Sequence, residues 1–314
     1  MKIGWVGVHE EGLPALRAVC DAGYRVTGLI TLRQDKADRR CGSGSYDQVC
    51  ADNGIPMHPV DHINDESSLQ ILREMRCDLL VVLGWGQILN QEALQLPTIG
   101  TVGAHASLLP HNRGSAPVNW AIIKGEATTG NSLMWLADGV DTGQLIDQRE
   151  FPITAYDTCD SIYHHVGTSN RDMVLSLLKQ LDAGKKPGRP QPHTDEPILP
   201  RRRPQDGQID WHRPAAQIYD LIRGVTRPYP GALGTIGGHT WKIWQAALLP
   251  VASDRPPGTV VGPVVSPDAS ACGVMISTGN GSLLLLEIED EAGHVLTGRD
   301  LCEHTFQPAI RRAA

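Results

Sequence analysis

The chain has 314 residues, of which 41% are hydrophobic, and a formal net charge of −7. This length and apolar content suffice for two domains that each bury a core. The acidic balance disfavours general binding of phosphate polymers, unless positive charge gathers on one face. No run of about 18 apolar residues occurs and the N-terminus lacks a secretory signal, so we expect no membrane span and a cytoplasmic location. The seven cysteines are scattered without a CxxC pair, which argues against a disulfide framework and against a zinc knuckle.

Short apolar runs alternate with amphipathic stretches in the first half of the chain. The expected strands are 2–8, 24–32, 77–85 and 99–105, and the expected helices are 13–23, 45–54 and 67–75. Strands that alternate with helices form βαβ units, so we expect a parallel sheet covered on both faces. The glycines near the N-terminus lack the spacing of a dinucleotide fingerprint, which disfavours nicotinamide binding.

The composition changes after a helical pattern over 160–184. A proline-rich polar stretch without an apolar period follows, and it predicts a linker. Beyond it, short apolar runs separated by Gly, Pro, Asp and Asn predict a small β barrel or sandwich. We therefore expect a first domain over 1–186, a linker over 187–205 and a second domain over 206–314.

His105 lies at the end of the strand expected over 99–105. Ligands of open parallel sheets gather at the carboxyl ends of the strands, although a core histidine would explain this position equally well. Asp141 lies in the sequence DGVDTG, between two apolar runs. A carboxylate beside an imidazole fixes its tautomer, whereas on its own this sequence is also typical of an ordinary Asx-rich turn.

Arg113 and Gly114 precede a helical pattern that Ser115 can cap. A helix N-terminus with an arginine beside it suits a phosphate or a carboxylate. The alternative is that Arg113 only ties the loop to its neighbours.

Together these segments resemble the signature of the folate-dependent formyltransferases. The resemblance rests on HASLLP at 105–110 followed by Arg113-Gly114, and on Asp141-Thr142-Gly143. Residues 207–233 resemble the start of the C-terminal barrel in methionyl-tRNA formyltransferases and in enzymes that formylate nucleotide-linked amino sugars. The resemblance implies an α/β fold, with a Rossmann-like catalytic domain followed by an OB-like β-barrel. It also implies transfer of a formyl group from 10-formyltetrahydrofolate to a primary amine, without a metal.

The resemblance assigns acid–base chemistry to His105 and Asp141. The family has an asparagine two positions before the histidine, but this chain has Gly103, which offers no side-chain amide to an oxyanion. Asn112 and Asn119 are candidates for a replacement, and we favour Asn119, although its role can also be packing or helix capping.

The resemblance places the folate between two segments, around 84–89 and 138–140. A flat pterin ring needs apolar walls and backbone donors and acceptors, which these segments can supply. The alternative for the first segment is that it is only a buried strand followed by its turn. The expected folate-binding residues are Gly84, Trp85, Gly86, Ile88, Leu89, Asp138, Gly139 and Val140. The expected acceptor-binding residues are Ser107, Arg113 and Gly114.

The charge pattern bears on the identity of the amine. The basic residues of the short segment 32–48 are partly offset by aspartates, and residues 201–314 contain eleven Lys or Arg against eleven Asp or Glu. A tRNA ligand requires phosphate-neutralising charge, so we favour a small amine, above all one on a nucleotide-linked sugar. Methionyl-tRNA formylation, hydrolysis of formyltetrahydrofolate and a non-catalytic binding protein are the alternatives. The oligomeric state, a homodimer included, stays open.

Overall fold

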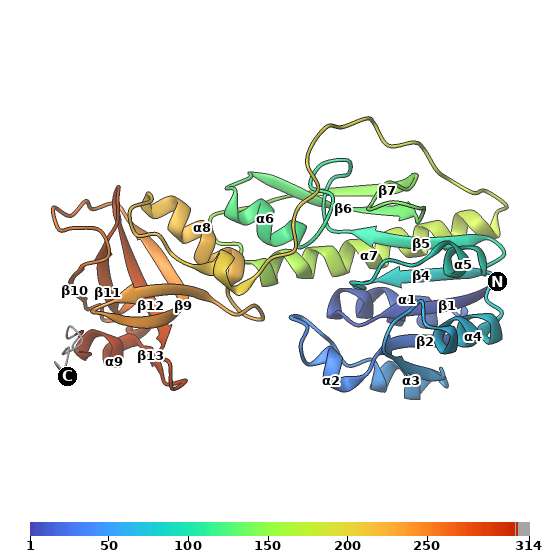
Figure 1. Ribbon diagram of the computed structural model, residues 1–314, viewed down its shortest axis with the longest axis horizontal. Helices are drawn as coiled ribbons and strands as arrows, with labels where there is room; N and C mark the ends of the chain where they lie inside the picture. Colours follow the sequence, from blue (N-terminus) through green and yellow to red (C-terminus); the bar gives the residue numbers. More distant parts are fainter. Residues whose placement is uncertain (305, 307–314) are drawn as a thin grey trace. The chain divides into compact units, whose positions relative to one another are not determined.

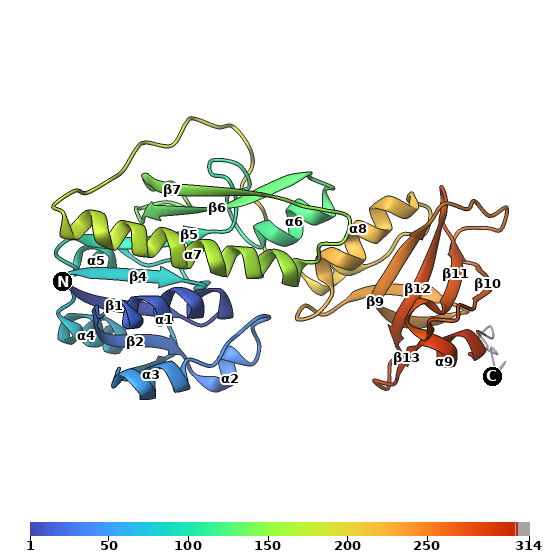
Figure 2. The same cartoon turned by 180° about the vertical axis from the view of Figure 1, so that it is seen from behind.

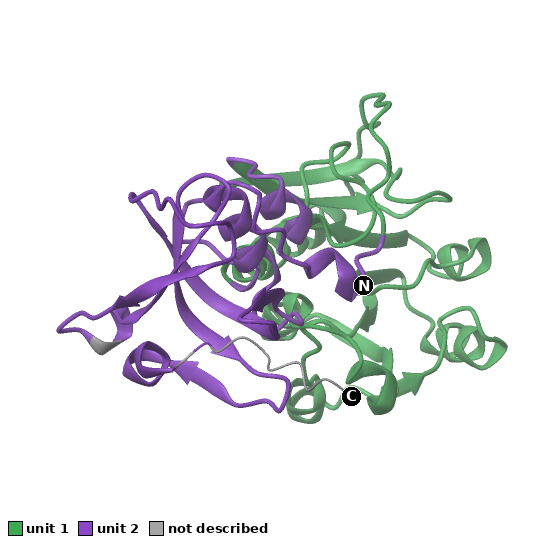
Figure 3. Cartoon of the chain, turned by 60° about the vertical axis from the view of Figure 1, so that its left-hand side comes forward, with its two compact units in different colours: residues 1–117, 128–152, 161–200 green, residues 118–127, 153–160, 201–314 purple. Residues whose placement is uncertain are grey.

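The computed structural model describes residues 1–304 and 306. The chain divides into two compact units, which Figure 3 distinguishes by colour. Unit 1 contains 1–117, 128–152 and 161–200, and unit 2 contains 118–127, 153–160 and the described residues from 201 onward. The sequence indicated one border along the chain, whereas two short segments of the expected first domain belong to unit 2.

Unit 1 contains a seven-stranded sheet in the order β3-β2-β1-β4-β5-β6-β7. Its strands are β1 (Lys2–Gly7), β2 (Arg25–Leu32), β3 (Met57–Val60), β4 (Leu79–Leu83), β5 (Gly100–His105), β6 (Thr128–Trp135) and β7 (Leu145–Pro152). The first five strands in this order pair in parallel, which confirms the expected Rossmann-like arrangement. The sheet is nevertheless mixed, because β6 pairs antiparallel with both β5 and β7.

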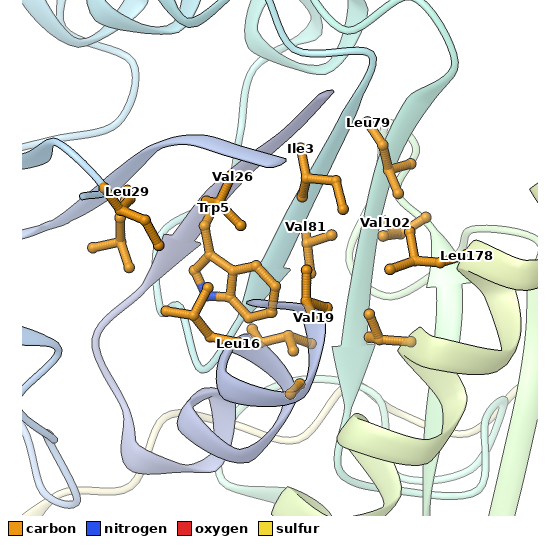
Figure 4. Close-up of a cluster of buried hydrophobic side chains, with 14 of the residues drawn as sticks. Ile3, Trp5, Leu16, Val19, Val26, Leu29, Leu79, Val81, Val102 and Leu178 are labelled. Carbon is orange, nitrogen blue, oxygen red and sulfur yellow. The ribbon is translucent and has the colours of Figure 1, made fainter. Parts of the chain in front are cut away.

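Helices cover both faces of this sheet, as the reverse views in Figures 1 and 2 show. They are α1 (Leu13–Asp21), α2 (Gln34–Ala37), α3 (Asp47–Asn53), α4 (Glu66–Met75), α5 (Gln91–Gln95) and α7 (Cys159–Asp182). In β4, Leu79 and Val81 join the cluster against α1 and α7, and Leu80 and Val82 join the cluster against α4 and α5. Figure 4 shows the first cluster around Trp5. The two-residue period of a strand buried on both faces thus builds two cores.

The stretch predicted to be a linker is held against unit 1 along much of its length. Residues 185–203 contain neither helix nor strand, but Arg189 forms an isolated bridge with Leu145, and Leu199 forms one with Gly114. We call residues 187–199 the strap. Its lack of an apolar period is explained by its attachment through backbone hydrogen bonds, which do not depend on side-chain type.

Unit 2 is built on an antiparallel sheet in the order β10-β11-β12-β9-β8, with β13 on β12. Its elements are α6 (Pro117–Ile123, entered from Pro117 of unit 1), α8 (Ala215–Val225), β8 (Ala232–Ile236), β9 (His239–Leu249), β10 (Val260–Val264), β11 (Gly273–Ser277), β12 (Ser282–Glu289), β13 (Val295–Thr297) and α9 (Gly298–Glu303). The expectation of a β domain is confirmed. Within the described residues β8 and β10 do not pair with each other, so the expected barrel is not closed. None of the described helices is both long and apolar enough to span a membrane.

Candidate active site

His105 is the last residue of β5, as the sequence predicted, and its side chain is 9% exposed. Its Nε2 lies 2.8 Å from the backbone carbonyl oxygen of Asn112. Because a carbonyl only accepts hydrogen bonds, Nε2 carries a proton in this arrangement. The neutral ring therefore has its free lone pair on Nδ1.

Asp141 faces that free nitrogen. Its Oδ2 lies 3.5 Å from His105 Nδ1 and also accepts a hydrogen bond of 2.9 Å from the N–H of Gly114. The structure thus brings together His105 and Asp141 from segments 36 positions apart. A proton taken up at Nδ1 is stabilised by the carboxylate beside it, so the pair is suited to acid–base chemistry.

Gly103 lies on β5 two positions before His105. Its backbone pairs with Val82 on one side and Met134 on the other, within the sheet. A Cβ added at Gly103 would lie 2.7 Å from Cδ2 of Leu136 and 3.1 Å from Cγ of the same residue. Leu136 therefore occupies the space in which a side chain at position 103 would begin.

Asn119 is fully buried on α6, which belongs to unit 2. Its amide nitrogen donates a hydrogen bond of 2.7 Å to the carbonyl oxygen of Gly224 on α8. This contact favours the packing role over that of an oxyanion donor. The other candidate, Asn112, contributes its backbone carbonyl to His105.

The segment 84–89 follows β4 directly. Gln87 holds it in place by donating to the carbonyl of Asp61 and accepting from the N–H of Ile63. Ile88 is 68% exposed, and the buried indole nitrogen of Trp85 has no hydrogen-bond partner among the described residues. The exposed apolar side chain of Ile88 suits one wall of a site for a flat heteroaromatic ring.

The second expected folate segment, 138–140, follows Leu136. Leu136 packs against the same apolar cluster as Leu89, so it places the start of this segment on the same face of the sheet. Thr142 closes the turn by donating to the carbonyl of Asp138. The folate-binding residues themselves stay a prediction.

The three residues expected to bind the acceptor differ in their surroundings. The buried Ser107 hydroxyl donates 2.7 Å to the carbonyl of His111, so it is engaged within the loop. Gly114 has φ +110°, and a Cβ there would lie 2.4 Å from the carbonyl oxygen of Leu199, so only glycine fits. Arg113 donates to Gln191 of the strap at 3.1 Å, while its buried Nε has no partner among the described residues.

A buried ionisable pair, which the sequence reasoning missed, lies in the turn after β1. His9 Nδ1 accepts from the N–H of Glu11 at 3.3 Å and lies 3.6 Å from Oε2 of the same residue. Burial lowers the pKa of His9 to about 4 and raises the pKa of Glu11 to about 7, although the N–H of Gly84 bonds to Glu11. Within the described residues, no group of three or more His, Cys, Asp or Glu is arranged to hold a metal.

The fold and the proximity of His105 to Asp141 agree with the family resemblance found in the sequence. Residues 36–178 match the family described as formyl transferase, and residues 202–305 match the one described as formyl transferase, C-terminal domain. Together the two matches take up more than half of the chain. The chain belongs to the formyl transferase family.

Several solved structures share the fold. HypX from Aquifex aeolicus, in complex with tetrahydrofolic acid, gives a TM-score of 0.67 at 18% identity, over 95% of this chain and 46% of HypX. The chain thus spans about half the length of HypX. An N-formyltransferase from Helicobacter canadensis, in complex with folinic acid and dTDP-3-aminofucose, gives a TM-score of 0.67 at 17% identity. The match covers 91% of this chain and 98% of the Helicobacter canadensis chain. Methionyl-tRNA formyltransferase from Clostridium thermocellum gives a TM-score of 0.58 at 19% identity. The match covers 79% of this chain and 94% of the Clostridium thermocellum chain.

Proposed function

We propose that this protein transfers a formyl group from 10-formyltetrahydrofolate to the primary amine of a nucleotide-linked amino sugar. The observation that carries the proposal is the juxtaposition of His105 Nδ1 and Asp141 at 3.5 Å, with His105 Nε2 held by a carbonyl. Ligands of the similar proteins support the donor and the acceptor, because the Helicobacter canadensis enzyme was crystallised with folinic acid and dTDP-3-aminofucose.

The two side chains perform the proton transfers of the reaction. The amine nitrogen forms a bond to the formyl carbon, and His105 removes a proton from that nitrogen through Nδ1. Asp141, 3.5 Å away, stabilises the imidazolium that forms. His105 then returns the proton to N10 of the folate as the bond from N10 to the formyl carbon breaks.

The charges of the segment after β2 support a small acceptor over methionyl-tRNA. Two of its basic residues share one carboxylate, which partly offsets their charge: Arg33 Nε lies 3.2 Å and Lys36 Nζ 2.9 Å from Asp61. A tRNA acceptor stem requires such charges to be available to phosphates. The similar proteins give no support to the alternative of a hydrolase.

The experiment is a formyl-transfer assay with three acceptors and one blank. Purified protein and 10-formyltetrahydrofolate are incubated with dTDP-3-aminofucose, with the free amino sugar, with methionyl-tRNA or without acceptor. Tetrahydrofolate release and formylated product are measured. We expect rapid turnover only with the nucleotide-linked sugar. Efficient formylation of methionyl-tRNA near physiological salt, or folate turnover without acceptor, would overturn the proposal.

A further inference from the structure

The strap crosses unit 1 at the turn that carries Asp141. At one end, Arg189 exchanges two backbone hydrogen bonds of 2.8 and 2.9 Å with Leu145. At the other end, Leu199 donates 2.7 Å to the carbonyl of Arg113 and accepts 3.1 Å from the N–H of Ser115. The strap is therefore fixed on both sides of Gln191.

Gln191 makes three side-chain hydrogen bonds to the residues around the site. Its Nε2 donates to the carbonyl oxygens of Asp141 and Gly143, both at 2.8 Å, and its Oε1 accepts from Arg113 at 3.1 Å. An amide nitrogen has two N–H groups, so both are used on the turn. A single half-buried side chain thus joins the turn to the loop that precedes α6.

The conformation of Asp141 makes such support necessary. Its φ is +52°, in the left-handed region that few residues other than glycine adopt. A residue persists there only where its surroundings fix it. The two hydrogen bonds from Gln191 bracket the turn on either side of Thr142, and the N–H of Gly114 holds the carboxylate itself.

We infer that Gln191 is a positioning residue for formyl transfer, which fixes the turn so that the carboxylate of Asp141 faces His105 Nδ1. This inference rests on the proposed roles of Asp141 and His105. Gln191 acts through the turn and does not itself touch the reacting atoms. Its removal lets the carboxylate move relative to the imidazole, and a misplacement of 1 Å can cost about 10²-fold in rate.

Two substitutions separate the turn from Arg113. Gln191→Met keeps the volume of the side chain and removes every hydrogen bond. Gln191→Glu loses both donors to the turn but keeps an acceptor for Arg113. Because the inference assigns the effect to the turn, both variants should lose at least about tenfold in kcat. Wild-type kcat in either variant would overturn it.

A double-mutant cycle with Asp141→Asn separates positioning from general destabilisation. If Gln191 acts through Asp141, Gln191→Met should change kcat by less than about twofold in the Asp141→Asn background. An unreduced effect in that background would overturn the inference. His193→Ala is the matched control on the strap, because this ring is 85% exposed and its Nε2 lies 3.8 Å from Oδ1 of the exposed Asp195, and it should keep wild-type kcat.

The same set distinguishes failure of the inference from failure of the proposed function. If Asp141→Asn itself keeps wild-type turnover, the proposed catalytic role is wrong. If Asp141→Asn is slow while Gln191→Met and Gln191→Glu are normal, only the inference on Gln191 is wrong. Thermal unfolding of each variant shows that it is folded at the assay temperature.

Discussion

At the scale of single residues, the imidazole of His105 is the group on which the proposed chemistry depends. His105→Ala should lower kcat by about 10²–10⁴-fold, because a positioned acid–base group contributes that much. Folate binding should stay near normal, since the expected folate segments lie elsewhere. Steady-state kinetics and titration with folinic acid measure the two effects. His294→Ala serves as the control, because that ring is 78% exposed in unit 2. More than about a tenth of wild-type turnover in His105→Ala would contradict the assignment.

Gly103 stands where the family resemblance led us to expect an asparagine, and the side chain of Leu136 occupies the space beside it. Gly103→Asn should slow turnover and weaken folate binding, because a Cβ at 2.7 Å forces Leu136 to move within the cluster that also contains Leu89. Kinetics and folinic acid titration of the variant test this.

A second substitution tells crowding from a missing oxyanion donor. Leu136→Ala makes room for the asparagine, so the double variant should recover part of the activity lost in Gly103→Asn. Leu136→Ala alone is the reference for that comparison. A gain in rate from Gly103→Asn by itself would show instead that the chain lacks a donor that nothing replaces.

At the scale of elements, the turn after β1 holds a buried pair whose effects on stability oppose each other. The pKa of His9 falls from 6.5 to about 4, so unfolding takes up a proton between these values and stability falls as pH decreases. The pKa of Glu11 rises from 4.5 to about 7, so unfolding releases a proton and stability falls as pH increases. In the wild type the two slopes nearly cancel between about pH 4.5 and 6.5.

Single substitutions should reveal how each residue alone makes the free energy of unfolding depend on pH. In Glu11→Gln the free energy of unfolding should rise from pH 4.5 to 6.5, relative to wild type, by a few kcal/mol. In His9→Asn, whose side chain can still cap the turn, it should fall over the same range. Urea unfolding at four pH values measures both effects. The same pH dependence in the wild type, Glu11→Gln and His9→Asn would contradict the opposed effects of the two residues.

The sequence predicted the elements that bury apolar side chains and missed those held by polar contacts. β4 and β5 were predicted from their apolar runs, because β4 contributes to both cores and β5 adds Val102 to the first, and this located His105 at a strand end. Asp141 was identified by its family motif, since an Asx-rich turn alone does not show what it faces. The contacts of Gln191 were not predictable, because a glutamine that bonds to backbone carbonyls leaves no pattern in a proline-rich stretch.

At the scale of the whole molecule, the charge distribution predicts how activity responds to salt. The net charge is −7, and Asp61 partly offsets the charges of Arg33 and Lys36 after β2. Raising NaCl from 50 to 200 mM should lower kcat/KM for a nucleotide-linked amine by less than about tenfold, whereas a ligand that engages 6–10 phosphates loses about 10³–10⁵ in affinity. A loss of that larger size would indicate an extended nucleic-acid contact.

The assembly of unit 2 from three stretches of chain restricts how the protein can be recombined with its relatives. The α8 helix depends on both inserted stretches: Asn119 bonds to Gly224, and the buried Arg223 donates to the carbonyls of Thr154 and Asp157 at 2.9 and 2.8 Å. A chimera that exchanges only residues 201–314 leaves these contacts facing a foreign helix. It should be insoluble or melt well below either parent, and carrying 118–127 and 153–160 along with the exchanged part should restore a soluble protein.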